Sequence, residues 1–292
     1  LEDGEIRFEK NEGFDLAPDA EPEWIAAEQS NSTLIVGRSA VLKLLRKIQP
    51  GIHPDLEMVR YLAGNGFANV PPILGSVTHF TADGPVLLML VQRFVLNQGD
   101  GWQWTLGALE RMANDTEWSF SNYRHFATNL GQRLAEMHRV LALNSGDPAF
   151  APEIMDAEET GRLGARIQRQ VDKALNLLGG DPPLDEDVRA AAHRLIAKRE
   201  TLMERIATNA QSAVGSPRTR IHGDLHLGQV LVTGNDVMII DFEGEPTRPI
   251  AERRAKDLPQ RDVAGMLRSF DYAAAVAERN CPAASESREQ HA

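Results

Sequence analysis

A chain of 292 residues is too long for one small core and suits two packed lobes. Its net charge of −11 argues against a nucleic-acid partner, which is bound through a surplus of lysine and arginine. The single cysteine, Cys281, excludes an internal disulfide and fits a cytoplasmic location, and the densest apolar run, Val86 to Val91, is too short to cross a membrane.

The first third of the sequence predicts a small sheet that carries one helix. Runs rich in β-branched and apolar residues predict strands at 32–36, 41–45, 73–80 and 86–95. Between them, Pro54-Asp55 opens a helix that Gly64-Asn65-Gly66 ends.

The pattern changes at Asn97, and the loop Gln98-Gly99-Asp100-Gly101 is the natural boundary between two lobes. Steps of three and four between apolar residues predict a long helix from Ser121. Further elements are expected as helices at 154–178 and 184–210, strands at 229–232 and 237–240, and a helix from about 261.

Two acids and an amide stand at a characteristic spacing in the last third of the chain. Asp224 lies in the segment Ile221-His222-Gly223-Asp224, Gln229 follows five residues later, and Asp241 ends a strand twelve residues beyond that. Protein kinases place a catalytic-loop aspartate, an asparagine and a second, metal-binding aspartate in this order. The spacing therefore predicts phosphoryl transfer from ATP, with Asp224 as the base and Gln229 and Asp241 as magnesium ligands.

Elementary chemistry accounts for these residue types. A hydroxyl nucleophile needs a carboxylate oriented near its proton, and magnesium prefers oxygen ligands such as a carboxylate and an amide carbonyl. The alternative is that His222-Gly223-Asp224 is an ordinary turn, because Asp and Gly are common turn residues. The joint pattern, with a strand on each side of a short turn, favours the kinase interpretation.

The N-terminal region supplies a candidate for holding the phosphates. Lys43 lies in an otherwise apolar strand, and Glu57 on the next helix is expected to pair with it as in kinases. The alternatives are a lysine that faces solvent and a glutamate on a solvated helix face. No glycine-rich loop precedes the strand, so backbone amides and small polar side chains are expected to contact the phosphates at Ser30, Asn31 and Ser32.

Four residues are predicted to contact the acceptor. His226 and Glu243 each lie within two residues of a catalytic acid and are expected to reach sugar hydroxyls. Trp102 is a candidate platform for a sugar ring, and core packing is the alternative for it and for Trp104. Arg253 is either a solvated surface residue or a contact to substrate or phosphate.

Two further residues have structural as well as functional interpretations. His138 on the long helix is expected to be packed or on the helix surface rather than a ligand. Asp262 either caps the start of the last helix or braces the catalytic loop from below, and we favour bracing.

These features predict an α+β, bilobal protein-kinase-like fold with a small β-rich N-terminal lobe and a larger, mainly helical C-terminal lobe. We expect residues 1–96 to form the nucleotide-binding lobe and residues 97–292 to form the catalytic and substrate lobe. ATP is then expected in the cleft between them.

Several segments together resemble bacterial maltokinase. The resemblance runs from Glu28 to Tyr272 and includes His53-Pro54-Asp55-Leu56-Glu57, Gly99-Asp100-Gly101-Trp102 and Asp241-Phe242-Glu243-Gly244-Glu245-Pro246. Maltokinases belong to the aminoglycoside-phosphotransferase-like branch of the kinase fold and occur alone or fused to trehalose synthase. The resemblance therefore suggests trehalose synthase as a partner, fused or associated.

The resemblance implies transfer of the γ-phosphoryl group of ATP to the anomeric hydroxyl of maltose, giving maltose 1-phosphate for α-glucan (glycogen) synthesis. It also implies that Lys43 and Glu57 form the ATP clamp, and that ATP and Mg²⁺ are the cofactors. Family members usually extend further at both ends. We therefore expect a remnant of an N-terminal cap before Glu28 and a truncated C-terminal lobe.

Two other functions are compatible with the residues. A related sugar or amino-sugar kinase, such as a glucosamine kinase, or an aminoglycoside phosphotransferase would show the same catalytic core. An inactive pseudokinase module of a trehalose synthase fusion is the weaker alternative, because such a module has no need of the intact catalytic set. That set is Lys43, Glu57, Asp224, Gln229 and Asp241.

Overall fold

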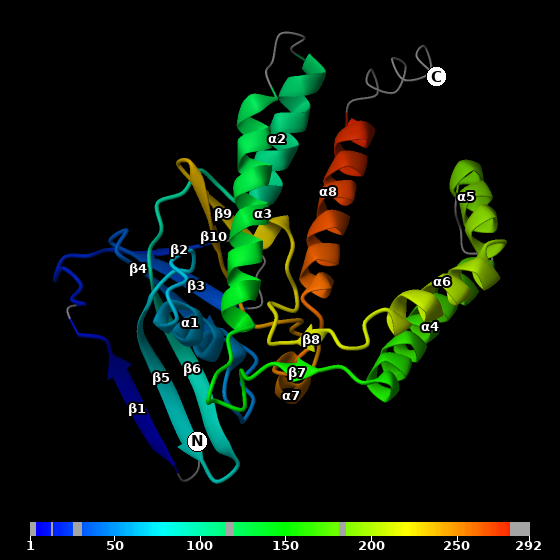
Figure 1. Ribbon diagram of the computed structural model, residues 1–292. Helices are drawn as coiled ribbons and strands as arrows, with labels where there is room; N and C mark the ends of the chain where they lie inside the picture. Colours follow the sequence, from blue (N-terminus) through cyan, green and yellow to red (C-terminus); the bar gives the residue numbers. More distant parts are fainter. Residues whose placement is uncertain (1–3, 13, 26–30, 115–119, 181–184, 281–292) are drawn as a thin grey trace. The chain divides into compact units, whose positions relative to one another are not determined.

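The computed structural model describes residues 4–12, 14–25, 31–114, 120–180 and 185–280 (Figure 1). Contacts divide the chain into two compact units. The main unit comprises Leu1–Ala151 and Thr219–Ala292, and the helical unit is Pro152–Arg218.

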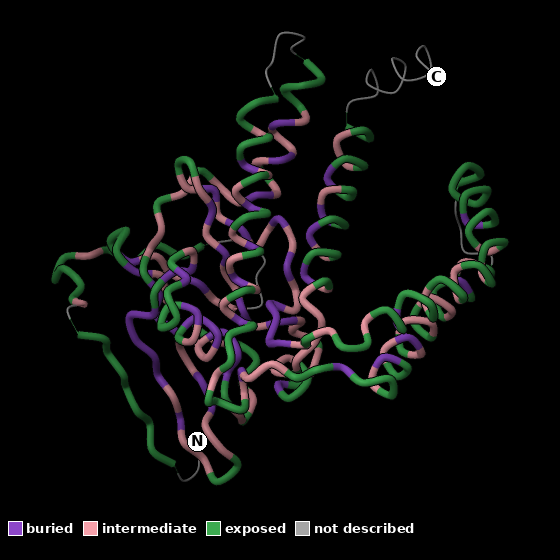
Figure 2. Tube along the Cα trace, in the orientation of Figure 1, coloured by how far each residue is buried: buried purple, intermediate pink, exposed green. Residues whose placement is uncertain are grey.

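The main unit contains a six-stranded antiparallel sheet in the order β1-β5-β6-β4-β3-β2. Its strands are β1 (Glu5–Lys10), β2 (Pro22–Trp24), β3 (Asn31–Val36), β4 (Ala40–Leu45), β5 (Ile73–Thr81) and β6 (Gly84–Arg93). The four strands predicted from the sequence correspond to β3, β4, β5 and β6. The edge strands β1 and β2 were not predicted; both are exposed along their whole length (Figure 2), so pairing to a neighbour rather than burial holds them.

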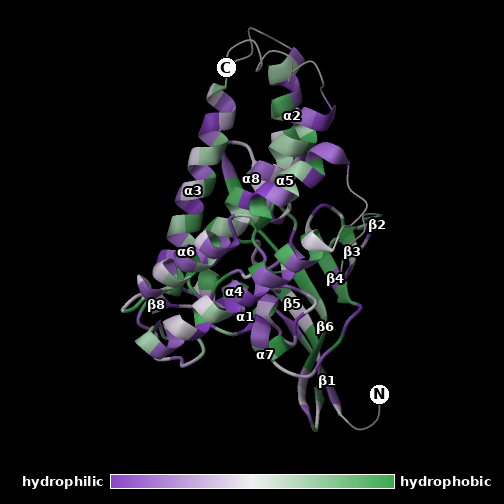
Figure 3. Cartoon of the chain, turned by 90° about the vertical axis from the view of Figure 1, so that its right-hand side faces the viewer, coloured by the Kyte–Doolittle hydropathy of each residue, from purple (hydrophilic) through white to green (hydrophobic). Residues whose placement is uncertain are grey.

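The two faces of the sheet pack against different groups. One face contributes Leu87 and Leu90 to the large core, together with Met58, Val59 and Leu62 of helix α1 (Pro54–Gly64). The other face forms a small cluster whose buried members are Ala40, Leu74 and Val91. Strands β4 and β6 consist mainly of hydrophobic residues (Figure 3), in keeping with the packing of both faces of the sheet.

Helix α1 begins and ends as its sequence predicts. Proline occupies the first turn, where its missing N–H costs nothing, and two acidic residues there oppose the positive end of the helix dipole. Asn65, just after the last residue, donates its backbone N–H to carbonyls of the final turn. This helix places Asp55 and Glu57 beside the site described below.

Three long helices and a hairpin complete the main unit. The helices are α2 (Gly101–Asn114), α3 (Ser121–Leu141) and α8 (Gln260–Asn280), and the hairpin is β9 (Val230–Thr233) with β10 (Asp236–Ile239). A short helix α7 (Ile250–Arg253) lies before α8, and the 3₁₀ turn η1 (Leu227–Gln229) lies before β9. The long helix from 121, the hairpin strands and the last helix were predicted.

Helix α2 was not predicted from the sequence. Its buried residues are Gly101, Thr105 and Ala108, which recur at helical spacing but are small or polar. A search for large apolar residues at steps of three and four does not find such a face. The Thr105 hydroxyl donates to the Gly101 carbonyl, so the buried oxygen is paired within the helix.

The helical unit contains α4 (Ala157–Gly179), α5 (Glu186–Ile196) and α6 (Arg199–Gln211), with the short strands β7 (Glu153–Ile154) and β8 (Pro217–Arg218) paired at its base. Asp156 and Glu159 form a capping box that starts α4. The single helix predicted over 184–210 is wrong, because a turn at 197–198 divides it into α5 and α6. No breaker residue marks this turn; both helices instead pack against α4.

The α+β fold with a β-rich N-terminal region and a helical C-terminal region is as predicted. The lobe boundary at residue 97 stays a prediction. Within the described residues, none of the helices is sufficiently long and apolar to span a bilayer.

Candidate active site

The loop that carries Asp224 is held by a buried aspartate. One oxygen of Asp262 accepts from the backbone N–H of His222 at 2.9 Å, and the other accepts from that of Gly223 at 2.9 Å. Asp262 also contacts His138 Nε2 at 2.9 Å, and only 1% of the residue is exposed. Burial alone would raise the pKa of Asp262, but the contact with His138 and the backbone donors lower it, so the carboxylate stays charged.

These contacts confirm that Asp262 braces the catalytic loop. They also give His138 a role that the sequence left open, because this packed histidine supports the brace. Gly223 has a φ of 83°, a left-handed conformation that favours glycine, so the turn before Asp224 depends on that residue.

Asp224 lies where two cavities meet. A first cavity of about 470 Å³ and a second of about 910 Å³ share only Asp224 and Gly228 among their lining residues. Burial raises the pKa of Asp224, and the nearby His226 and His222 oppose that rise. A carboxylate at such a position can face a phosphoryl donor in one cavity and a phosphoryl acceptor in the other.

Lys43 faces the first cavity and is paired with two acids. Its Nζ lies 3.3 Å from Asp55 and forms a close ion pair with Asp241. Burial disfavours the ammonium, but the charges of Asp55 and Asp241 raise the pKa of Lys43 above its ordinary value. Asp55 also accepts from the backbone N–H of Phe242, next to Asp241, so it holds both the lysine and the segment that carries Asp241.

The predicted pair between Lys43 and Glu57 is not formed in this structure. Asp55 and Glu57 are two positions apart on α1, which places them about 200° apart around the helix, so only one faces the lysine. Glu57 instead accepts from Arg220 at 2.8 Å and from Arg254 at 2.6 and 2.9 Å. The acid that pairs with Lys43 is therefore Asp55.

Gln229 and Asp241 line the same cavity from the two ends of the β9–β10 hairpin. Asp241 has a φ of 60°, which is uncommon for a residue other than glycine. The backbone N–H of Ile240 donates to the carbonyl of Gln229 and draws the two ends together.

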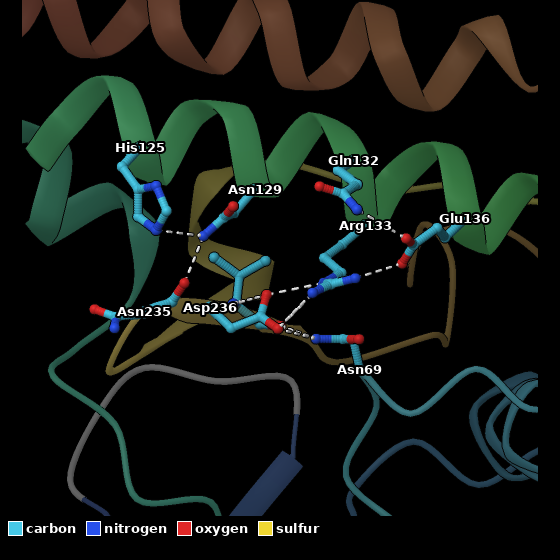
Figure 4. A network of polar contacts seen from close by, with 9 residues as sticks. Asn69, His125, Asn129, Gln132, Arg133, Glu136, Asn235 and Asp236 are labelled. Carbon is cyan, nitrogen blue, oxygen red and sulfur yellow. Dashed lines mark hydrogen bonds and ion pairs between the residues drawn. The ribbon is translucent and has the colours of Figure 1, made fainter. Parts of the chain in front are cut away.

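A polar network outside the cavities holds the turn of this hairpin (Figure 4). Arg133 on α3 donates three hydrogen bonds to Asp236, at 2.9, 3.2 and 2.8 Å, and also contacts Glu136. Asn69 donates to the Val237 carbonyl at 2.8 Å from the other side. The hairpin that spaces Gln229 and Asp241 is thereby fixed to α3.

The residues predicted to contact the phosphates lie in different positions. Asn31 lines the first cavity. Ser32 does not, because adjacent residues of a strand point to opposite faces. Ser30 lies outside the described residues.

Of the predicted acceptor contacts, His226 and Trp102 line the second cavity. Both Trp102 and Trp104 pack against the core, and Trp102 also lies across from Tyr272, with ring centroids 5.5 Å apart. Burial lowers the pKa of His226, and its Nδ1 accepts from the Gly228 backbone N–H, so the ring is neutral and fixed.

The other two predicted acceptor contacts are placed differently. Glu243 lines the first cavity, and Arg253 lies 3.7 Å from its carboxylate and donates to its backbone carbonyl. The Arg253 side chain is 4% exposed and lines neither cavity, so the solvated-surface interpretation is wrong, while contact with substrate or phosphate stays a prediction.

Comparison with known proteins assigns the family. A model of the phosphotransferase enzyme family (APH) matches residues 23–280. The chain belongs to this family.

Two curated relatives of this phosphotransferase are glucosamine kinases. The one from Mycolicibacterium smegmatis is 34% identical over 255 residues, and the one from Streptacidiphilus jiangxiensis is 29% identical over 256 residues. The alignments cover 87% and 86% of this chain but only 59% and 54% of the relatives. The chain thus spans somewhat more than half the length of the relatives that it matches.

Solved structures agree with these relatives. A glucosamine kinase structure superposes with a TM-score of 0.75, at 26% identity, over 95% of this chain and 62% of its own. A glucosamine kinase in complex with glucosamine, ADP and inorganic phosphate gives a TM-score of 0.74 at 27% identity, over 95% of this chain and 61% of that one.

These relatives overturn the prediction of a maltokinase. Many of the residues behind that prediction lie at the first cavity and in the loop that carries Asp224, and sequence motifs of this kind are common to kinases of different substrates. The phosphotransferase family is confirmed, and the specific assignment to maltose is wrong. The names of the relatives give no support to a link with α-glucan or trehalose metabolism.

Three site residues of the phosphotransferase were missed in the sequence. Asp55 stands two positions before Glu57, and Arg220 precedes Asp224 by four. Gln92 lines the first cavity and is 3% exposed. The sequence did contain a signal for Gln92. It is a lone amide in the apolar run of β6, at a position where the alternation of side chains along the strand predicts burial.

Proposed function

We propose that this phosphotransferase transfers the γ-phosphoryl group of ATP to a hydroxyl of glucosamine or a closely related amino sugar. The observation that carries the proposal is the position of Asp224, which lines both cavities at the point where they meet. The relatives named glucosamine kinase supply the acceptor, and the structure of one with glucosamine, ADP and inorganic phosphate supplies the nucleotide class.

In this proposal the first cavity holds ATP. Lys43 is the cation for its phosphates, and Asp55 keeps the ammonium charged and oriented while the cavity is empty of nucleotide. Apolar side chains that line the cavity suit the flat purine base of ATP. They are Ile35 and Val41 from β3 and β4, with Leu231 and Ile240 opposite.

Gln229 and Asp241 fit a magnesium ion. They offer an amide carbonyl and a carboxylate, and magnesium completes its shell with phosphate oxygens and waters, so two protein ligands suffice. In the described part of the chain, no group of three or more histidine, cysteine, aspartate or glutamate side chains is placed to hold a metal ion by itself. When bound, the ion would neutralise charge on the transferred phosphoryl group. Asp241 would then exchange its contact with Lys43 for the metal.

The second cavity holds the acceptor in this proposal. Asp224 accepts the proton of the attacking hydroxyl, and its raised pKa makes it a better base than an ordinary aspartate. Four carboxylates and two arginines line the same cavity, so its lining is net negative, which suits a protonated amino sugar; they are Asp100, Asp224, Glu245 and Asp262 with Arg261 and Arg268. Trp102 offers an apolar face for the ring.

The test is a competition among acceptors with limiting ATP and Mg²⁺. Equal concentrations of glucosamine, glucose and maltose are supplied together, and the phosphorylated products are resolved by mass spectrometry. Glucosamine phosphate is expected to dominate. If glucose or maltose phosphate dominates, the amino-sugar assignment is wrong and the kinase assignment stands.

Two variants show whether the chemistry belongs to this site. Asp224→Asn removes the base, while Asp271→Asn removes an exposed carboxylate on α8 and serves as the control. Loss of product with the first and not with the second is expected. If no sugar is phosphorylated by the wild-type chain, the kinase assignment itself fails and the pseudokinase alternative gains.

A further inference from the structure

Gln92 is a polar side chain buried in an apolar strand at the wall of the first cavity. The residue is 3% exposed, and its Nε2 atom has no hydrogen-bond partner among the described residues. It nevertheless lines the cavity that we assign to the nucleotide. A buried amide donor left unpaired is costly, so its occurrence beside a cavity points to a partner that enters with the ligand.

The register of the sheet places Gln92 relative to Lys43. Gln92 of β6 is directly opposite Val41 of β4, and Lys43 is two residues further along β4. Directly paired residues and residues two apart point to the same face of a sheet. Gln92 and Lys43 therefore share the cavity face, separated by one strand spacing and roughly 7 Å along the strand.

This spacing matches the two ends of a nucleotide. The lysine and Asp241 mark the phosphate end of the cavity, and apolar residues wall the part nearer Gln92. Among the described residues that line this cavity, Gln92 has the only fully buried side-chain amide nitrogen without a hydrogen-bond partner, and it lies where the base is expected.

We propose that the Gln92 carboxamide binds the N6/N7 edge of adenine and makes the site select ATP over GTP; this rests on the first cavity being the nucleotide site. Adenine presents an amino donor at N6 beside an acceptor at N7, and a carboxamide presents an acceptor beside a donor, so two hydrogen bonds form. Guanine presents two acceptors, O6 and N7, on the same edge, so one of them faces the carboxamide oxygen without a proton. Gln92 is thus a specificity-determining residue for the nucleotide.

The experiment measures binding of ADP, GDP and tripolyphosphate to the wild type and to Gln92→Met by isothermal titration calorimetry. Methionine keeps the length of the side chain and removes both polar atoms. ADP affinity is expected to fall about fivefold to tenfold, GDP affinity to change less than twofold, and tripolyphosphate affinity to stay unchanged because it has no base. Gln92→Leu repeats the measurement with a different apolar shape.

Tyr61→Phe is the matched control. The Tyr61 hydroxyl is also buried without a partner in the described part of the chain, but Tyr61 lines neither cavity and stacks on Phe150. ADP affinity is expected to be unchanged in this variant. Thermal unfolding without ligand shows whether each variant is folded, and Gln92→Met is expected to match or exceed the wild type because an unpaired amide is removed.

Three results would overturn the proposal. ADP affinity within twofold of the wild type in both Gln92 variants means that the amide does not contact the base. An equal loss for tripolyphosphate means that the cavity is distorted rather than stripped of a base contact. A wild-type chain that binds no purine nucleotide overturns this proposal and the proposed function together. If the chain selects adenine but does not phosphorylate glucosamine, Gln92 still binds the base and only the assignment of the acceptor is wrong.

Discussion

At the scale of single residues, the site depends on carboxylates whose charges are balanced in different ways. Asp224 is half-buried, and burial raises its pKa against the opposing charges of His226 and His222. Asp262 is almost fully buried, yet its hydrogen bonds keep its pKa low. The fold therefore favours proton uptake by Asp224, as the proposed base requires, whereas it holds Asp262 as an anion that orients the loop.

The first prediction concerns Asp224. Asp224→Asn keeps the shape of the side chain and removes the proton acceptor, so turnover is expected to fall by about 10²- to 10⁴-fold. ADP affinity, measured by calorimetry, is expected to change less than twofold because no donor to the nucleotide is removed. Turnover within tenfold of the wild type would show that Asp224 is not the base.

At the scale of elements, the first turns of α1 and α8 both support the site. Helix α1 begins next to His53, whose side chain makes no capping hydrogen bond, and presents Asp55 to Lys43. Helix α8 presents Asp262 to the catalytic loop, and its Ser269 hydroxyl accepts from the Leu227 backbone N–H two turns further on. Each helix thus uses one polar face to hold a loop and its apolar face to join the core.

The second prediction concerns the brace. Asp262→Asn leaves one carbonyl to accept hydrogen bonds where two oxygens and a charge are needed, so the free energy of unfolding is expected to fall by about 2 to 4 kcal/mol. Urea unfolding measures this loss, and turnover of the folded protein is expected to fall as well, because the loop before Asp224 loses its anchor. Asp271→Asn on the exposed side of the same helix is expected to stay within about 0.5 kcal/mol of the wild type. A stable and fully active Asp262→Asn variant would contradict the bracing role.

The third prediction concerns pH and the start of α1. Burial lowers the pKa of His53 from 6.5 to about 4, and its Nδ1 has no partner among the described residues. The unfolded chain therefore binds this proton more readily than the folded chain does, so stability is complete above pH 6.5 and is lost as pH falls toward 4. The loss attributable to His53 is at most about 3 kcal/mol, taken from 1.36 kcal/mol per pKa unit.

His53→Gln is the variant that isolates this effect. Unfolding free energies from urea titrations at pH 7.5 and pH 4.5 are compared between the variant and the wild type. The difference between the two pH values is expected to be smaller in the variant, because one group no longer takes up a proton on unfolding. Equal differences in both proteins would show that His53 is not held neutral by the fold.

At the scale of the whole main unit, a buried ion-pair cluster joins segments that are far apart in the sequence. Glu57 of α1 binds Arg220, just before the catalytic loop, and Arg254, just after α7. The Arg220 side chain is 1% exposed and its guanidinium lies 5.1 Å from the centre of the Phe150 ring. Glu57 therefore links α1 to the segment just before the Asp224 loop and to the segment just after α7.

The fourth prediction concerns this link. Glu57→Ala leaves Arg220 buried without its carboxylate, so the free energy of unfolding is expected to fall by about 3 to 5 kcal/mol. The double variant Glu57→Ala/Arg220→Met also removes the fully buried charge of Arg220 and leaves only the partly exposed Arg254 without its carboxylate, so it is expected to recover a measurable part of that loss. Urea unfolding of both single variants and the double variant gives the coupling energy. Strictly additive losses would show that the two side chains do not depend on each other.

The sequence alone determined the kinase-like fold and singled out Asp224, Gln229 and Asp241, which line one cavity. The spacing of Asp224, Gln229 and Asp241 was informative because the β9–β10 hairpin between them has a set length, so distance along the chain converts to distance in space. The main strands and the long helices were predictable for a similar reason, since their periodic apolar residues report burial directly. Helix α2 and the edge strands lacked that signal, because small buried residues and exposed pairing leave no apolar period.

Only the tertiary structure decided which partners these residues have. Asp55 and Glu57 are almost equivalent in sequence, and the rotation of α1 relative to β4 selects Asp55 for Lys43 and turns Glu57 toward Arg220 and Arg254. The meeting of two cavities at Asp224 and the placement of Gln92 opposite Val41 likewise depend on contacts between residues far apart in the chain. Local patterns carry no information on such contacts, because side-chain pairing across a fold depends on the orientation of whole elements. For the same reason the sequence motifs, which describe the shared phosphoryl-transfer machinery, pointed to the wrong sugar.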